Sequence, residues 1–393
     1  MTTMTGRPPG ATEWFQRAKK IRQQQLNHLA QCGTLVNHLS RLVHMLQCER
    51  GASNIWLCSH GQLYAPECKA SRALVDEALT AFHRSLNSPS TLSGSALCER
   101  IAMALGELER LTALREAIVN LNITAHQAME QYSRTLRHLL SIIPQLNDSI
   151  DDPQIAGRFV ALYSLMQGKE WVGQERALGA MGFTQGHFSD EMRQTLVDRI
   201  EAQQACFEIF LTRVNAAMQT AFHAHAQPHG DIEKLRRIAC TRQPADDNGS
   251  TALNWFNLQT TRLENLRALE EDAIADLMAD VQARIPLERE APLFKGEDNI
   301  LPLFPDKALL PLVRQQAGEI ERLSRQLASL RDTLEARKTI DKAKNLLMAH
   351  QNMSEEQAWG ALRKMAMDKN QRMVDIAQAL LTVKTLWQLT PKG

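Results

Sequence analysis

Apolar residues recur at helical spacing along most of this chain and predict long amphipathic helices. From about Trp14 to Asp280 the apolar positions follow the i, i+3, i+4, i+7 spacing of a helix face, as in the run Leu35, Leu39, Leu42, Leu46 and Ile55. Polar stretches rich in Pro, Gly and Ser interrupt this pattern at 88–94, 148–153, 182–189, 228–230 and 244–250. Long helices joined by short polar turns are typical of antiparallel bundles. Because some 260 residues exceed one four-helix unit, we expect two packed bundles that share helices.

The pattern changes after residue 284. Five prolines between Ile285 and Pro311 predict a helix-free linker over 285–311. A different apolar repeat follows, with gaps of seven, three, four, three and four residues, as expected for the a and d positions of a coiled coil: Val313, Ile320, Leu323, Leu327, Leu330 and Leu334. No neighbouring segment of comparable length is available to cover this seam. We therefore expect a homodimer formed through residues 313–334, and a seam buried within one chain is the alternative.

Three short amphipathic helices are predicted at the C-terminal end, between Ile340 and Leu389. Ser354 and Gln357 have the spacing of a capping box that starts the second of these helices. Asn370 is a suitable N-cap for the third. So small a unit cannot house an enzyme pocket, but it can present charged side chains to a partner.

Positive charge is concentrated in this C-terminal unit. From Lys338 onward, nine Lys and Arg face five Asp and Glu, whereas the formal net charge of the whole chain is only +1. A cationic end on an otherwise neutral protein indicates nucleic-acid binding. A solvated helix face explains such an excess equally well, so charge alone does not decide the function.

The residues of this unit resemble the signature of the ANTAR family. The matching positions are Ala343-Lys344, Leu347-Met348, Ser354-Glu355, Ala358, Leu362-Arg363, Ala366-Met367, Asn370 and Asp375-Ile376-Ala377. ANTAR domains bind RNA and act as transcription antiterminators, so the resemblance implies leader-mRNA stem-loops as the partner and prevention of terminator formation as the action. The residues expected at the RNA surface are Lys342, Lys344, Arg363, Lys364, Lys369, Asn370 and Arg372. A ligand-responsive DNA-binding regulator is the alternative.

Two Glu-Arg dyads lie in apolar helical surroundings upstream. Glu49-Arg50 is followed by Gly51, and Glu175-Arg176 is followed by Ala177. A buried arginine must pair with an acid or bind a ligand, because an isolated buried charge is costly. The forked donors of guanidinium suit a small oxyanion. Internal ion pairs, Arg50 with Glu175 or Arg176 with Glu49, are the alternative interpretation.

The two dyads resemble the pattern of the NIT family of nitrate- and nitrite-sensing domains, which have Glu-Arg-Gly-x-Ser followed far downstream by Gly-x-Glu-Arg-Ala. The resemblance implies that nitrate lies between the two bundles, held by Arg50, Arg176 and Arg236. The sequence does not distinguish Arg236 from Arg237. The expected organisation is then an N-terminal segment (1–30), a NIT sensor (31–284), a linker (285–311) and a coiled coil with an ANTAR domain (312–393). In this arrangement, anion binding in the sensor releases the RNA-binding unit.

Other functions are disfavoured by the residues that are missing. The sequence contains no P-loop or dinucleotide fingerprint, so we expect neither an enzyme nor a cofactor. Its seven cysteines form no C-x-x-C pair, and no apolar run approaches the length of a membrane span, which together predict a reduced, cytoplasmic protein. His223, His225 and His229 lie close together, but they lack acidic or Cys partners at ligand spacing, so we expect no metal site there.

Overall fold

The computed structural model describes residues 10–87, 94–146, 152–241, 244, 249–292, 339–349, 353–368 and 373–389. Throughout these segments the regular secondary structure is helical, which confirms the predicted all-α class. The chain divides into two compact units, Met1–Leu310 and Pro311–Gly393. Within the described segments, no helix combines the length and the apolar character needed to cross a bilayer.

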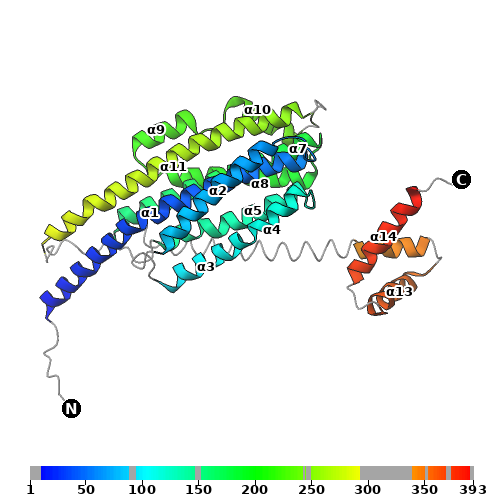
Figure 1. The fold of residues 1–393 in the computed structure, drawn as a ribbon, viewed down its shortest axis with the longest axis horizontal. Coiled ribbons are helices and arrows are strands. Elements are labelled where there is room, and N and C mark those ends of the chain that lie inside the picture. The colour runs from blue at the N-terminus through cyan, green and yellow to red at the C-terminus, as the bar shows by residue number, and fades with distance from the viewer. Residues whose placement is uncertain are drawn as a thin grey trace, which may run out of the picture. The chain divides into compact units, whose positions relative to one another are not determined.

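Three long helices run side by side through the large unit (Figure 1): α1 (Ala11–Cys58), α7 (Pro153–Thr184) and α11 (Ser250–Glu290). Each of the three packs against the other two. Shorter helices cover this spine on two sides. In one group, α2 (Ala65–Leu86) packs on α1, α5 (Ala125–Leu140) on both α1 and α7, and α6 (Ile142–Gln145) on α7. In the same group, α3 (Ser95–Glu109) and α4 (Leu111–Val119) pack on α5. The other group packs on α7 and α11, namely α8 (Asp190–Leu211), α9 (Ala216–His225) and α10 (Gly230–Thr241). The expected pair of bundles with shared helices is therefore present.

Local sequence signals explain where several of these helices begin. Asp152 caps α7 by accepting hydrogen bonds from the backbone N–H of Gln154 (2.9 Å) and Ile155 (3.2 Å), and Pro153 occupies the first helical position. Thr124 and Gln127 form a capping box at the start of α5. The predicted interruption at 148–153 thus ends where α7 begins, because Asp152 satisfies free backbone donors of the first turn. The turn before α5 was not among the predicted interruptions.

The prediction that Pro286 breaks the last long helix is wrong. Helix α11 continues through Pro286 to Glu290. Proline removes one backbone hydrogen bond from a helix interior, but here the end of α11 is held by the start of α1. Arg22 forms an ion pair with Glu288 (2.6 Å), and Lys19 donates to the carbonyl of Ala291 (2.5 Å).

The small unit contains a helix at residues 339–349, followed by α13 (Glu355–Asp368) and α14 (Met373–Leu389). A compact core of small and aliphatic side chains joins them: Ala343, Leu347, Ala358, Leu362, Ala366, Ile376 and Ala377. The predicted capping box is confirmed, because the backbone N–H of Ser354 donates to Gln357 Oε1 (2.9 Å) and the N–H of Gln357 donates to Ser354 Oγ (3.3 Å). The predicted heptad helix at 313–334 and the Asn370 cap lie outside the described residues.

Candidate functional site

Arg50 lies on α1 in the middle of the large unit, with only 1% of its surface exposed. Its guanidinium forms a fork on Glu170 of α7, with Nη1 2.5 Å from Oε1 and Nη2 3.1 Å from Oε2. Nη1 also donates to Ser133 Oγ on α5 (2.9 Å). The side-chain amides of Gln47 and Gln174 each donate to Glu170 at 2.9 Å. Arg50 is therefore a buried cation whose acidic partner is also buried and accepts hydrogen bonds from several protein groups.

Arg176 lies on α7 and is almost as deeply buried, at 2% exposed, but its environment differs. Nη2 donates to the backbone carbonyl of Gln47 on α1 (2.7 Å), and Nη1 donates to Thr260 Oγ1 on α11 (2.9 Å). Its Cζ lies 4.7 Å from the centroid of the Phe256 ring, a cation–π contact. None of the acidic side chains that the structure describes lies within ion-pair distance of this guanidinium. Arg176 is therefore held only by neutral groups.

Burial lowers the pKa of the Arg176 guanidinium from its usual 12.5 to about 10. The charge of Cys48 opposes this shift and the charge of Arg50 adds to it, while Glu264 and Glu170 act more weakly in the opposing direction. A guanidinium in this position is still charged near neutral pH, and removal from water destabilises it. A small anion beside it would supply the missing counter-charge.

Two glycines allow the arginines to cross between the helices. A Cβ added at Gly173 of α7 would lie 2.3 Å from Arg50 Nη2. A Cβ added at Gly51 of α1 would lie 2.5 Å from Arg176 Nη2 and 3.2 Å from Phe256 Cζ. Each arginine therefore lies against a glycine of the opposite helix. The glycine after the first dyad therefore allows the close approach of an arginine from α7.

Arg236 of α10 also points into the protein, at 7% exposed, whereas its neighbour Arg237 is exposed to solvent. Its Nε and Nη2 form a fork on the two oxygens of Glu175, each at 2.7 Å. Nη1 pairs with Glu233 at 2.7 Å. Arg236 thus uses partners different from those of Arg50 and Arg176, and the geometry selects it over Arg237 as the interior arginine of α10.

The two ion pairs considered as alternatives from the sequence, Arg50–Glu175 and Arg176–Glu49, do not form. Glu49 is instead held by Arg115, whose Nε and Nη2 lie 2.7 Å from its two oxygens. Consecutive residues of a helix point about 100° apart. The acid and the base of each dyad therefore point in different directions. Glu49 pairs with Arg115 and Arg50 with Glu170, whereas Glu175 pairs with Arg236 and Arg176 contacts only neutral groups.

Several site residues could not be read from the sequence. Glu170, the partner of Arg50, lies in an apolar run without any motif, and Thr260 is an ordinary helix residue. Arg262 of α11 is another buried cation; burial lowers its pKa to about 10, and it donates to the carbonyl of Ala226 (2.9 Å) and to Gln203 Oε1 (3.0 Å). The neighbours of Arg262 in the sequence are mostly polar, so no local pattern marked it as buried.

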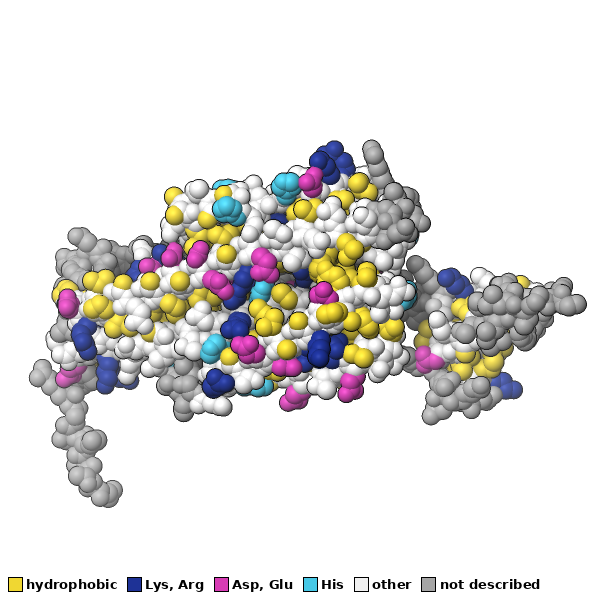
Figure 2. All heavy atoms as spheres, turned by 45° about the horizontal axis from the view of Figure 1, so that its top comes forward, with side chains coloured by type: hydrophobic (Ala, Val, Ile, Leu, Met, Phe, Trp, Pro, Cys, Tyr) yellow, Lys and Arg dark blue, Asp and Glu magenta, His cyan; other side chains and the backbone are white. Residues whose placement is uncertain are grey.

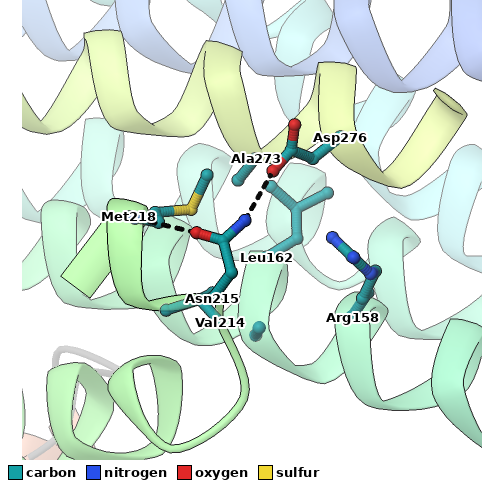
Figure 3. A pocket seen from close by; sticks show the side chains of 8 residues that line it. Arg158, Leu162, Val214, Asn215, Met218, Ala273 and Asp276 are labelled. Atoms are coloured by element: carbon teal, nitrogen blue, oxygen red, sulfur yellow. Dashed lines mark hydrogen bonds between the residues drawn. The ribbon is translucent and has the colours of Figure 1, made fainter. Parts of the chain in front are cut away.

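A small pocket lies between α7, α11 and the start of α9, away from these arginines (Figure 3). Its volume is about 10 Å³, room for no more than one water. Asn215, which caps α9, donates to Asp276 Oδ2 (3.3 Å) and accepts from the backbone N–H of Met218 (2.9 Å). Because these polar groups are already paired, we do not consider the pocket a ligand site.

Figure 2 shows no patch of basic side chains on the drawn face of the large unit. Basic and acidic side chains are mixed on that face, with apolar side chains between them. The arginines with unusual surroundings are the interior ones described above. Because Arg50 and Arg176 are buried, and a low dielectric strengthens charge recognition, these interior arginines are the candidate anion site of the large unit.

In the small unit, Lys342, Arg363 and Lys364 are exposed. Lys344 instead pairs with Glu355 (2.7 Å) and Asp341 (3.2 Å), so its charge joins the helix at 339–349 to the start of α13. The remaining predicted RNA-contacting residues, Lys369, Asn370 and Arg372, lie outside the described residues.

An exposed aromatic residue adjoins this basic surface. The Arg363 guanidinium carbon lies 5.6 Å from the centroid of the Trp359 ring, and the Trp359 residue is 45% exposed. Sequence reasoning did not single out Trp359. Trp359 lies one helical turn before Arg363 on a polar helix face, and this spacing could have identified it.

Comparison with known proteins decides the family. Residues 41–278, more than half of the chain, match the NIT family, which is described as nitrate and nitrite sensing. The chain belongs to the NIT family. Residues 328–381 match the ANTAR domain. The NIT match begins within α1, ends within α11, and includes Arg50, Arg176 and Arg236.

This NIT-family chain is similar over its full length to a characterised regulator. It is 58% identical over 395 residues to the nitrate regulatory protein of Klebsiella oxytoca, covering 100% of both chains. It also resembles the solved structure of the NasR transcription antiterminator, with a TM-score of 0.73 and 58% identity, covering 96% of this chain and 100% of that one. Both resemblances recognised in the sequence are confirmed.

Proposed function

We propose that this NIT-family protein is a nitrate- and nitrite-responsive transcription antiterminator and not an enzyme. Its NIT unit senses the anion, and its ANTAR domain binds leader-RNA stem-loops so that a terminator hairpin does not form. The full-length similarity to a nitrate regulatory protein and to a transcription antiterminator supports this assignment. Because its partner is a nascent transcript, we place its action in the cytoplasm.

The observation that carries the sensing proposal is the buried Arg176 guanidinium that only neutral groups contact. Nitrate is planar and trigonal, and each of its oxygens accepts hydrogen bonds from guanidinium edges. The Nε atoms of both Arg50 and Arg176 are buried and have no hydrogen-bond partner among the residues described. We propose that these two guanidinium groups hold the anion between α1 and α7.

Arg236 is the third proposed contact. Glu175 accepts hydrogen bonds from Nε and Nη2 of Arg236 in this structure. Arg236 therefore reaches the anion only when one of these N–H groups is released from Glu175. Arg50 faces a similar exchange, because Glu170 holds the groups that nitrate would use. Anion binding therefore competes with internal carboxylates, and this competition supplies two states with different affinities for the ligand.

The rearrangement would reach the ANTAR domain through α11. Thr260, which contacts Arg176, belongs to α11, and the chain continues from this helix toward the C-terminal unit. We propose that anion binding shifts α1 and α7 against α11 and thereby releases the ANTAR domain for RNA. The active form is a homodimer joined through residues 313–334.

On the RNA-binding unit, we propose that Lys342, Arg363 and Lys364 contact the stem-loop together with Lys369, Asn370 and Arg372. Sequence-specific RNA recognition favours loops whose bases can be splayed out and stacked on aromatic rings. The exposed Trp359 ring beside Arg363 suits such stacking. The pairing of Lys344 with Glu355 gives that lysine a part in orienting the helices as well.

Calorimetric titration with nitrate tests the sensing site directly. The wild-type protein should bind nitrate, whereas Arg50→Ala and Arg176→Ala should show affinities lower by at least about 10-fold, the effect of losing one charged hydrogen-bonding partner. Arg237→Ala, the exposed neighbour of Arg236, is the matched control and should bind normally. Wild-type affinity in both interior variants would contradict the proposal.

A gel-shift assay with leader RNA and with duplex DNA of the same sequence tests the output. Nitrate should increase binding to the RNA and leave the duplex unbound. Binding to the duplex in preference to RNA would favour the alternative of a ligand-responsive DNA-binding regulator.

A further inference from the structure

A histidine, a cysteine and a glutamate meet on the surface of the large unit where α1 packs against α11. His44 and Cys48 are four residues apart on α1 and therefore share one face of that helix. Their Nε2 and Sγ atoms lie 3.7 Å apart. Glu264 approaches from α11, with Oε1 3.5 Å from the same Nε2. The three potential ligand atoms all lie within 4.8 Å of one another.

These separations are close to those of ligands that share one metal ion. Tetrahedral zinc has bonds of about 2.3 Å to sulfur, about 2.0 Å to nitrogen and about 2.1 Å to oxygen. At the tetrahedral angle these bonds place sulfur and nitrogen about 3.6 Å apart, and nitrogen and oxygen about 3.4 Å apart. The observed 3.7 Å and 3.5 Å agree with both values. Rotation of the Glu264 side chain, which is 54% exposed, would bring its carboxylate to the distance from Cys48 Sγ at which both can bind one ion.

We propose that His44, Cys48 and Glu264 form a binding site for a thiophilic divalent cation, with Zn²⁺ as the best-suited ion. The set has three protein ligands, one each of nitrogen, sulfur and oxygen, and the exposed Glu264 edge leaves the fourth position to solvent. A thiolate and a carboxylate supply two negative charges, which match the charge of the ion.

The charges around the cluster also bear on a bound cation. Arg176 and Lys169 are the cations nearest to the cluster, and their charges oppose a bare metal ion. Lys169 is already paired with Glu270, which offsets its charge.

A hydrogen-bonded chain without metal fits the same contacts less well. A single atom, His44 Nε2, faces both the thiol and the carboxylate, and one ring nitrogen can donate only one proton or offer only one lone pair. His44 Nδ1 is buried and makes no hydrogen bond to a described residue. The polar contacts of this nearly buried imidazole therefore all pass through the nitrogen that faces the cluster.

The experiment uses the full-length protein, freed of metal by chelation and then titrated with Co²⁺ and with Zn²⁺. When cysteine is a ligand, bound Co²⁺ gives a thiolate-to-metal charge-transfer absorption in the near ultraviolet. Zn²⁺ should displace the Co²⁺ ion and remove this absorption, with one Zn²⁺ bound per chain. Cys48→Ser should abolish the charge-transfer band and weaken Zn²⁺ binding by about 100-fold or more, beyond the effect of losing an outer-shell group.

Two variants keep the test decisive. Cys206→Ser removes another half-buried thiol, on α8, whose pKa burial raises to about 11, and it should leave the band and the affinity unchanged. Glu264→Gln changes a half-exposed side chain without threatening the fold, and it should weaken binding while the thiolate band persists at higher Co²⁺ concentration. The absence of a stoichiometric thiolate band in the wild type, or its persistence in Cys48→Ser, would overturn the proposal. Neither result bears on nitrate binding, which the calorimetry tests separately.

Discussion

Replacing Arg176 with methionine is expected to stabilise the protein and to abolish its response to nitrate. Burial lowers the pKa of this guanidinium from 12.5 to about 10. Since one pKa unit corresponds to about 1.4 kcal/mol, the charged form is destabilised in the folded protein by about 3 kcal/mol. Methionine has a similar length and carries no charge, so the substitution removes this cost.

Part of that gain is offset by contacts that the substitution removes. The cation–π contact with Phe256 contributes about 1 to 2 kcal/mol at a buried site. Thr260 keeps a partner, because its hydroxyl also donates to the carbonyl of Phe256 at 2.7 Å. The expected net effect is therefore an increase of about 1 to 2 kcal/mol in the free energy of unfolding.

Urea unfolding in nitrate-free buffer, repeated at saturating nitrate, measures both parts of this prediction. At a concentration 100 times the dissociation constant, nitrate should stabilise the wild type by about 2.7 kcal/mol and leave Arg176→Met unchanged. Arg236→Met is the matched contrast: it leaves Glu175 buried without its main cation and should lose about 3 to 5 kcal/mol. If Arg176→Met were clearly destabilised, or if nitrate still raised its midpoint, the reasoning about an uncompensated charge would be refuted.

Three further outcomes are expected. Gly51→Ala should reduce nitrate affinity by about 10-fold in calorimetry, because the new Cβ would lie 2.5 Å from Arg176 Nη2 and displace one charged donor; unchanged affinity would count against the position assigned to the anion. Burial alone would raise the pKa of Glu270, but the charges of Lys169 and Arg267 and the hydrogen bonds from Lys169 and Ser40 together outweigh it, so this pKa lies below its usual 4.5. The buried pair therefore stabilises the fold above that pH, and stability is lost as pH falls below it; Glu270→Gln should flatten this acid limb in thermal melts. Arg363→Ala should weaken RNA binding and reduce its salt dependence by about one ion in gel shifts, while nitrate affinity stays normal.

The sequence predicted the helical class and the interior arginines, because each depends on local patterns. Apolar spacing identifies a helix face, and an arginine within an apolar run must be buried or bound. The partners of those arginines depend on how α1, α7 and α11 pack, which no local pattern contains. Glu170 rather than Glu175 therefore binds Arg50, and the lack of an acidic partner for Arg176 emerges only when three helices are placed together.

The histidines illustrate the same limit. His223 and His229 are close in sequence but have separate partners in the structure. His223 contacts Gln227 (2.8 Å), and His229 contacts Asp231 (3.3 Å). The cluster with ligand geometry instead combines residues of α1 with Glu264 of α11. Helices far apart in the chain supply the donors, so spacing rules for metal motifs do not apply to it.

Glu175 and Arg176 connect α7 to most of its neighbouring helices, and Gln174 before them supports Glu170 within α7 itself. Gln174 supports the carboxylate held by Arg50, Glu175 joins α8, α10 and α11 through Gln203, Arg236 and Gln259, and Arg176 joins α1 and α11. A turn of α7 about its axis by a small angle would disturb all of these contacts together, since they radiate from one point of the helix. Conformations of the sensor between its two states are therefore high in free energy. Each molecule should switch between these states in one step as nitrate rises, without a graded series of intermediates.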